Sequence, residues 1–211
     1  VCDRLRDNPL FQASVDRAAM IYDDDAYFAH FARLCGPRTR LFCDITPGYA
    51  LIGREGFAFL RSFCASQDVA LKILYVMRDP VERLWSHVRY VNHLDSRQEA
   101  ARTWRDLIVD PAFMARSAYR ETVEALDAVF APDELVYAFY EDLFTQDGVS
   151  DLCASVGVPA APAEFSVRHN ETSIKVDLPQ AARAAFARAL AGEYAFCRSR
   201  FGHRVPSAWA V

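Results

Sequence analysis

The sequence predicts one α/β domain over residues 1–211, with a mostly parallel sheet in a three-layer arrangement between helices. First, short apolar segments alternate along the chain with longer segments of helical periodicity, which is the pattern of a parallel sheet flanked by helices. Second, a chain of 211 residues, of which 52% are apolar and 25% charged, can bury one sizeable core. Third, no repeat, low-complexity tract or linker divides the sequence.

The first predicted unit is a strand, a crossover helix and a second strand. Residues 40–45, "RLFCDI", form a short apolar run closed by Pro47, which predicts a strand running into a turn. Residues 53–67 carry apolar side chains at helical spacing and predict the crossover helix. Residues 71–77 are continuously apolar except for Lys72, as expected for a strand covered on both faces.

The alternation continues to the end of the chain. A helix begins at residue 80, and helical periodicity extends over residues 103–130. Residues 134–140, "ELVYAFY", predict a third strand, and residues 141–157 predict the helix that follows it.

The final helix has the clearest boundaries. It is predicted to start from an Asp177 N-cap, with Pro179 near the first turn, and to stop at Gly202. Its predicted buried stripe consists of Phe186, Leu190, Tyr194, Cys197 and Phe201.

Composition and charge argue against several classes of protein. A net charge of −4 argues against a nucleic-acid partner, because a phosphate backbone demands a basic surface. The 6 cysteines are scattered without CxxC pairs, which favours reduced thiols in the cytoplasm over a zinc site. We expect no membrane span, because no apolar run approaches the roughly 20 residues that one needs. The alanine- and arginine-rich composition favours a bacterial source.

The stretch "LKILYVMRDPVERLWSHVRY" places a cation at the junction of a strand and a helix. Asp79 as N-cap, Pro80 at the first helical position and Glu82 at the third predict a capping box, so the helix starts directly after Arg78. Ligands of open α/β sheets bind outside the carboxyl ends of the strands, and a helix N-terminus offers free N–H groups to an anion.

An anion site at this junction is one of two interpretations. The Arg78 guanidinium can grip a phosphate with paired hydrogen bonds, and the Ser86 hydroxyl, two turns along the polar helix face, can bond the same group. The alternative is a surface arginine paired with a carboxylate, beside a solvated serine. The opposite, buried arc of the helix is predicted to hold Val81, Leu84, Trp85, Val88 and Val91.

The order of residues in "RDPVERLWS" resembles the 3′-phosphate-binding motif of sulfotransferases that use 3′-phosphoadenosine 5′-phosphosulfate. The resemblance is to the heparan-type and bacterial branch of the family. In that motif a strand ends in Arg-Asp-Pro, a second arginine follows in the helix, here Arg83, and a serine lies eight residues after the first arginine. The resemblance implies that Arg78 and Ser86 hold the 3′-phosphate of the donor.

Other stretches are similar to the family in the same order along the chain. They are "DITPGYAL", "FYEDL" at residues 139–143, and "VRHNETSIK" followed by "LPQAARAAF". The resemblance implies a P-loop-NTPase-like sulfotransferase fold that moves a sulfuryl group to a hydroxyl or amine without a metal. The implied partners are the nucleotide donor and an acceptor, which can be a carbohydrate, peptide, lipid or small metabolite.

Two family elements have no counterpart in the sequence. The glycine- and threonine-rich loop with a lysine, which cradles the 5′-phosphosulfate after the first strand, is not matched by "GREG" at residues 53–56. The general-base glutamate is not matched by the acidic run at residues 23–25, which fits a solvated helix start. We therefore expect an N-terminally truncated domain, whose first strand, phosphate loop and catalytic residues precede Val1.

Three further residues are candidates for contact with the acceptor. Asp44, Thr46 and Tyr49 follow the predicted strand at residues 40–45, where Asp44 can orient an acceptor hydroxyl. The alternative is that Asp44 and Thr46 only stabilise the turn.

The remaining polar residues have simpler interpretations. His87 is interpreted as solvated, and Glu141 and Asp142 as helix-capping acids. His169 and Lys175 lie in the loop that would close over the nucleotide, where a plain surface loop is the simpler interpretation.

Two other functions remain open. The chain can be a non-catalytic remnant that keeps the fold and the nucleotide pocket, which the missing loop favours. A nucleotide kinase of the related P-loop fold is disfavoured because no Walker lysine or lid arginine cluster is found.

Overall fold

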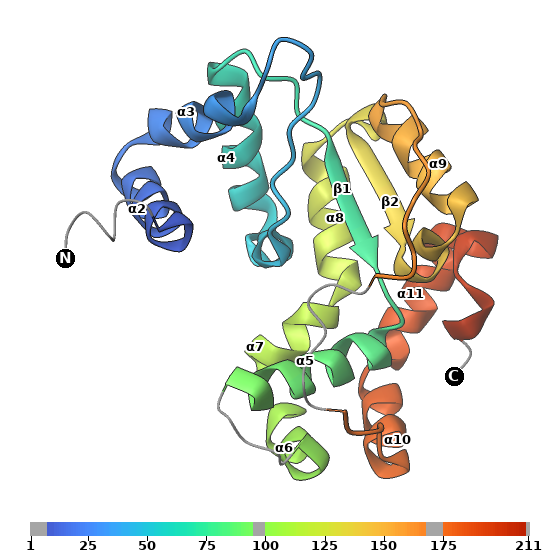
Figure 1. Cartoon of the computed structure of the whole chain (residues 1–211). Coiled ribbons are helices and arrows are strands. Elements are labelled where there is room, and N and C mark those ends of the chain that lie inside the picture. Colours follow the sequence, from blue (N-terminus) through green and yellow to red (C-terminus); the bar gives the residue numbers. More distant parts are fainter. Residues whose placement is uncertain (1–7, 95–99, 168–174, 210–211) are drawn as a thin grey trace. The chain divides into compact units, whose positions relative to one another are not determined.

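The computed structural model describes residues 8–94, 100–167 and 175–209 (Figure 1). By contacts the chain forms two compact units, unit 1 at residues 1–46 and unit 2 at residues 47–211. The single domain over residues 1–211 stays a prediction.

Unit 1 consists of two helices and an irregular segment. The helices are α2 (Pro9–Tyr22) and α3 (Asp24–Leu34). The Asp23 side chain caps α3 by accepting the Asp25 N–H at 3.0 Å, so the acidic run is a helix start as expected. None of the side chains described in this unit is buried.

The strand predicted at residues 40–45 is wrong. The segment has no regular secondary structure, and Leu41 and Ile45 are 47% and 85% exposed. A strand needs a neighbouring strand to bond its N–H and C=O groups, and the described part of unit 1 contains none. The apolar pattern was present without a partner.

Unit 2 holds a two-stranded parallel sheet made by β1 (Ile73–Met77) and β2 (Leu135–Phe139) (Figure 1). The register pairs Ile73 with Leu135 and Met77 with Phe139, so both carboxyl ends lie at one edge. The helix predicted at residues 53–67 is present as α4 (Gly53–Ser66), after the 3₁₀ turn η1 (Pro47–Leu51). It is not a crossover between two strands, because the described residues before it form no strand. The described residues thus form a helix-rich α/β arrangement with two strands in place of the three expected.

Only one face of β1 is buried. Met77 is fully buried and Tyr75 half-buried, whereas Leu74 and Val76 are 41% and 39% exposed. Alternate side chains of a strand point to opposite faces, so one face of β1 lacks cover from the described residues. The expected burial on both faces is therefore wrong.

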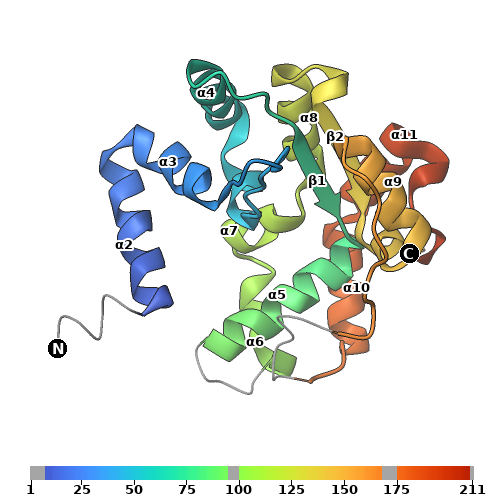
Figure 2. The ribbon, with the colours of Figure 1, turned by 45° about the horizontal axis from the view of Figure 1, so that its top comes forward.

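Helix α5 (Pro80–Leu94) leaves the carboxyl end of β1, and α10 (Gln180–Ala189) lies beside it in both views (Figures 1 and 2). Its predicted apolar arc is confirmed, since Val81, Leu84, Trp85 and Val88 are buried. Val91, the last member of that arc, is half-buried.

The helical pattern over residues 103–130 is divided into separate elements. They are α6 (Ala100–Leu107), α7 (Pro111–Met114), η2 (Ala115–Ser117) and α8 (Tyr119–Val129). Pro111 has no N–H and cannot extend α6, and Asp110 caps the new start by accepting the Ala112 N–H at 2.9 Å.

The helix predicted at residues 141–157 is also divided. The turn η3 (Pro132–Glu134) precedes β2, and η4 (Tyr140–Phe144) follows it before α9 (Gln146–Val156). Thr145 separates the two helical pieces because its hydroxyl caps α9, accepting the Gly148 N–H at 3.0 Å.

The final helix is present as two segments, α10 (Gln180–Ala189) and α11 (Ala191–Phe201), followed by η5 (Gly202–Arg204) and η6 (Ser207–Trp209). The predicted stripe is confirmed: Phe186, Leu190, Tyr194, Cys197 and Phe201 are all buried. Gly202 ends α11 with a φ of 57°, a value that favours glycine. The Asp177 cap is wrong, since extended Pro179 is the N-cap of α10.

Candidate functional site

A pocket of about 370 Å³ lies at the carboxyl end of the sheet, where β1 passes into α5 and β2 into η4. We call it the Arg78 pocket. Its lining comes from the junction between β1 and α5 and from α5, η4, α10, α11 and η6. It consists of Arg78, Asp79, Val81, Glu82, Tyr140, Glu141, Arg183, Ala187, Tyr194 and Ala208. The cation predicted at this junction therefore opens onto a concave surface.

Tyr119, at the start of α8, holds the backbone of Arg78. Its hydroxyl donates to the Arg78 carbonyl at 2.7 Å and accepts the Arg78 N–H at 3.2 Å. The guanidinium lies over the Tyr140 ring, 4.7 Å from the centroid, and the side chain is 26% exposed. Two tyrosines thus fix both ends of Arg78 at the edge of the sheet.

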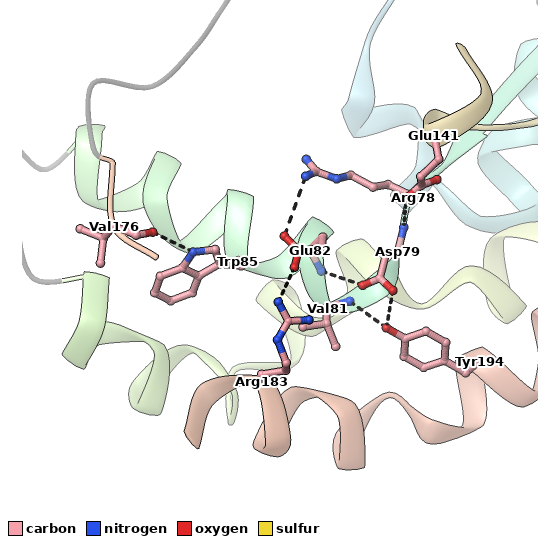
Figure 3. Close-up of polar contacts among 9 residues, drawn as sticks. All are labelled: Arg78, Asp79, Val81, Glu82, Trp85, Glu141, Val176, Arg183 and Tyr194. Carbon is pink, nitrogen blue, oxygen red and sulfur yellow. Dashed lines mark hydrogen bonds and ion pairs between the residues drawn. The ribbon is translucent and has the colours of Figure 1, made fainter. Parts of the chain in front are cut away.

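Asp79 is the N-cap of α5, as predicted, but the capping box is not formed. Its Oδ1 accepts the Glu82 N–H at 2.9 Å, while its own N–H donates to Glu141 Oε1 at 2.9 Å (Figure 3). Glu82 does not return the bond because its carboxylate pairs with arginines. Glu141 of η4 takes that part of the box from another element.

Tyr194 of α11 completes the network under the helix start. Its hydroxyl donates to Asp79 Oδ2 at 2.9 Å and accepts the Val81 N–H at 3.4 Å. Burial and the Asp79 carboxylate raise the pKa of Tyr194 above its usual value. Burial raises the pKa of Asp79, while the bonds from the Glu82 N–H and the Tyr194 hydroxyl oppose that rise.

The first-turn amides of α5 all have partners inside the protein. Pro80 has no N–H, and those of Val81 and Glu82 bond Tyr194 and Asp79. The Arg83 N–H donates to the Asp79 carbonyl at 2.8 Å. The expectation of free N–H groups for an anion is therefore wrong, and only side chains are left to bind one at this junction.

The side-chain charges of the pocket centre on Glu82. Arg183 Nη2 lies 2.8 Å from Glu82 Oε1, and Arg78 Nη2 lies 4.0 Å from Glu82 Oε2 (Figure 3). The side chain of Glu82 is 34% exposed and that of Arg183 56%. One carboxylate thus lies between two guanidinium groups at the open side of the pocket.

Among the described residues, only one carboxylate oxygen of Glu141 has a hydrogen-bond partner. Oε1 accepts the Asp79 N–H, whereas Oε2 is buried and has no hydrogen-bond partner among the described residues. An unpaired buried carboxylate oxygen is costly, and a hydroxyl or amine donor in the pocket would reduce that cost. Glu141 therefore does not cap the helix that follows β2, as predicted, but lies in η4 and bonds the Asp79 N–H at the start of α5. Asp142, in contrast, is exposed, and its carbonyl accepts the Thr145 hydroxyl.

Ser86 lies near the pocket but does not line it in the part of the chain that the structure describes. It is half-buried on α5, one turn beyond Glu82 on the same face.

His87, the next residue along, differs from the solvated histidine expected. Its ring stacks on Phe113, with centroids 5.2 Å apart. Burial, Arg116 and Arg83 together lower its pKa to about 4.

The acceptor candidates lie in both units. In unit 1, Asp44 Oδ1 accepts the Thr46 hydroxyl at 2.6 Å and Oδ2 accepts the Tyr27 hydroxyl at 3.2 Å. These bonds fit the turn-stabilising alternative. In unit 2, Tyr49 is half-buried in η1 and does not contribute to the described lining of the Arg78 pocket.

The segment before α10 is tied to α5 by a bond that the sequence did not reveal. Trp85 Nε1 donates to the Val176 carbonyl at 3.1 Å (Figure 3). Lys175 beside it is exposed, and His169 lies outside the described residues. Loop contacts with a nucleotide stay a prediction.

Sequence reasoning missed Arg183, Tyr119 and the hydroxyl role of Tyr194. Tyr194 carried a usable signal, since a tyrosine on a buried stripe needs a partner for its hydroxyl. Arg183 carried none, because it is an exposed helix arginine 101 residues from Glu82 in sequence.

No protein-family model matches the chain, and neither the curated proteins nor the solved structures include a significant match. Within residues 8–94, 100–167 and 175–209, no group of three or more His, Cys, Asp or Glu side chains is placed to hold a metal ion. No helix in these ranges is long and apolar enough to cross a membrane.

Proposed function

We propose that this chain is a sulfotransferase domain of the P-loop-like, three-layer α/β class that uses 3′-phosphoadenosine 5′-phosphosulfate. The observation that carries the proposal is Arg78, held by Tyr119 and Tyr140 at the carboxyl end of a parallel strand and open to a pocket. Ligands of parallel α/β sheets bind at this edge. The order of residues from Arg78 to Ser86 supplies the family.

In this proposal Arg78 binds the 3′-phosphate through charge-assisted hydrogen bonds, and Ser86 adds a hydroxyl from the polar face of α5, two turns along the chain. Because the first-turn amides are bonded internally, the guanidinium is the main source of affinity.

The free thiols of Cys35, Cys43, Cys64, Cys153 and Cys197 support a cytoplasmic location.

The reaction would be an in-line displacement at sulfur. The acceptor oxygen or nitrogen forms a bond to sulfur while the bond from sulfur to the 5′-phosphate oxygen breaks, and adenosine 3′,5′-bisphosphate leaves with those electrons. A base takes the acceptor proton, and positioning with cationic stabilisation of the leaving oxygen lowers the barrier. In this proposal the residues of the Arg78 pocket bind the 3′ end of the donor.

Calorimetric titration with adenosine 3′,5′-bisphosphate tests the proposal. Arg78→Ala is expected to weaken binding by about 2 to 5 kcal/mol, as for loss of a partly buried charge partner. Arg78→Lys should restore only part of the affinity, because an ammonium group lacks the planar fork. Arg188→Ala, on the exposed side of α10, is the matched control and should bind normally.

The proposal is wrong if the unaltered chain does not bind the bisphosphate or if Arg78→Ala leaves its affinity unchanged. ATP as a competitor separates a nucleotide kinase, which would prefer the triphosphate. Equal unfolding temperatures of the variants would exclude a general loss of structure.

A nucleotide-binding module without transferase activity is the second candidate. It is favoured because no lysine contributes to the described lining of the Arg78 pocket. Lys72 instead donates to the Ser155 carbonyl at 2.9 Å, and Lys175 is not among the described residues that line the pocket. Release of adenosine 3′,5′-bisphosphate from the donor, measured with a panel of hydroxyl and amine acceptors, would support the enzyme. Tight binding without any release would support the module.

A further inference from the structure

We propose that Arg183 of α10 is a second phosphate-binding cation in the Arg78 pocket, and that Glu82 occupies the place of the phosphate when no nucleotide is bound. This inference rests on the proposed function, because it names the group that the pocket holds. It adds a residue outside the Arg-Asp-Pro motif and gives the site an internal competitor.

The two arginines of the pocket lie around one carboxylate, that of Glu82. Glu82 presents Oε1 to Arg183 Nη2 at 2.8 Å and Oε2 to Arg78 Nη2 at 4.0 Å, with both arginines in the lining of the pocket (Figure 3). A guanidinium group binds a carboxylate and a phosphate oxygen pair with the same planar fork. The Glu82 carboxylate therefore marks a position that two cations already address.

A phosphate can easily replace the Glu82 carboxylate in this arrangement. The contact between Arg78 and Glu82, at 4.0 Å, is an ion pair beyond hydrogen-bond distance. The side chain of Glu82 is 34% exposed, so it can turn into water without moving α5. A phosphate monoester carries up to two charges and three acceptor oxygens, and can bond both arginines at once.

The charges that line the pocket indicate which carboxylate can be displaced. Arg78 and Arg183 face three carboxylates, those of Asp79, Glu82 and Glu141. Asp79 and Glu141 are committed to the α5 junction, because Asp79 accepts the Glu82 N–H and the Tyr194 hydroxyl, and Glu141 accepts the Asp79 N–H. Glu82 is thus the carboxylate that can leave, and its departure removes the repulsion closest to the arriving phosphate.

Arg183 is carried by a helix that packing holds in place. Helix α10 is fixed against the core by buried Ala182 and Phe186, which flank Arg183 on the helix. The Arg183 Cα is therefore held by packing, while its 56% exposed side chain is free to follow a ligand. Arg188 on the same helix is exposed and does not contribute to the described lining, which makes it a matched control.

The test is calorimetry on the full chain with adenosine 3′,5′-bisphosphate and, separately, adenosine 5′-monophosphate. Arg183→Ala is expected to weaken bisphosphate binding about tenfold, the effect of one charge-assisted contact. Glu82→Gln is expected to strengthen it about threefold to fivefold, because a competing charge is removed at a screened site. Binding of the 5′-monophosphate should change less than twofold in each variant, and Arg188→Ala should match the unaltered chain.

The double variant Glu82→Gln/Arg183→Ala distinguishes direct contact from an effect through Glu82. If Arg183 binds the phosphate, its loss weakens binding about tenfold in the Glu82→Gln background as well. If Arg183 only holds Glu82 aside, its loss has no effect there, and the inference is overturned.

The failures of the inference and of the proposed function are separable. A chain that does not bind the bisphosphate overturns both. A chain that binds it in an Arg78-dependent way, with Arg183→Ala and Glu82→Gln unchanged, overturns the inference alone.

Discussion

Two cationic regions along α5 balance their charge in different ways. In the Arg78 pocket, two arginines share the Glu82 carboxylate. In the second region the positive charges of Arg83 and Arg116 both act on His87, and the described residues provide no ion pair for either arginine.

The difference shows two solutions to the cost of a partly buried cation. The pocket supplies an exchangeable carboxylate, which suits a site that takes up an anion. In the second region burial and the two arginines bring the pKa of His87 to about 4, so the imidazole beside them stays uncharged at neutral pH. Burial also lowers the pKa of Arg83, which keeps its charge. Substitutions in one region can therefore be compared with the other region as reference.

The largest effect is expected for Asp79, on which the pocket depends. Asp79→Ala should lower the free energy of unfolding by about 3 kcal/mol, because α5 loses its cap and the buried Tyr194 hydroxyl loses its acceptor. Urea denaturation measures the loss.

Asp79→Asn is the matched variant. It keeps an acceptor oxygen for the cap, and asparagine caps helices about as well as aspartate, so a loss of only about 1 kcal/mol is expected. Equal losses for both variants would show that the charge of Asp79, rather than its hydrogen bonds, stabilises the junction.

The second effect is a dependence of stability on pH that comes from His87. Between the folded pKa of about 4 and the usual value of about 6.5, the unfolded chain binds a proton that the folded chain does not. Stability from this group is complete above pH 6.5 and is lost as the pH falls through about 4. With partial solvent screening the loss amounts to about 2 kcal/mol.

Urea unfolding between pH 4 and 7 measures this effect, and His87→Phe is the control. Phenylalanine keeps a ring against Phe113 but cannot titrate, so the slope with pH should decrease. Arg116→Gln should leave the ring in place and raise the pKa of His87, which NMR titration would detect. An identical slope in His87→Phe would assign the pH dependence to other groups.

The smallest effect is expected for Glu82. Glu82→Gln should change the free energy of unfolding by less than about 0.5 kcal/mol, because exposed ion pairs stabilise proteins little. A loss well above 1 kcal/mol would mean that Glu82 is a structural residue of the pocket, not an exchangeable one.

Predictions from the sequence were right where they depended on neighbouring residues and wrong where they depended on residues far along the chain. The start of α5, its buried arc and the stop at Gly202 were predicted because the cap, the proline and the glycine are adjacent to the elements they limit. The strand at residues 40–45 failed because an apolar run cannot report whether a partner strand exists. The capping box failed because Glu82 had stronger partners elsewhere.

By itself, the sequence determined the junction: a strand end, Arg78, the Asp79 cap and a helix whose polar face carries Ser86. These features depend on residues within two helical turns of one another, where propensity and capping act. Only the tertiary structure decided what surrounds Arg78. Tyr119, Glu141, Arg183 and Tyr194 form bonds across separations of 41, 62, 101 and 115 residues, which packing alone brings together.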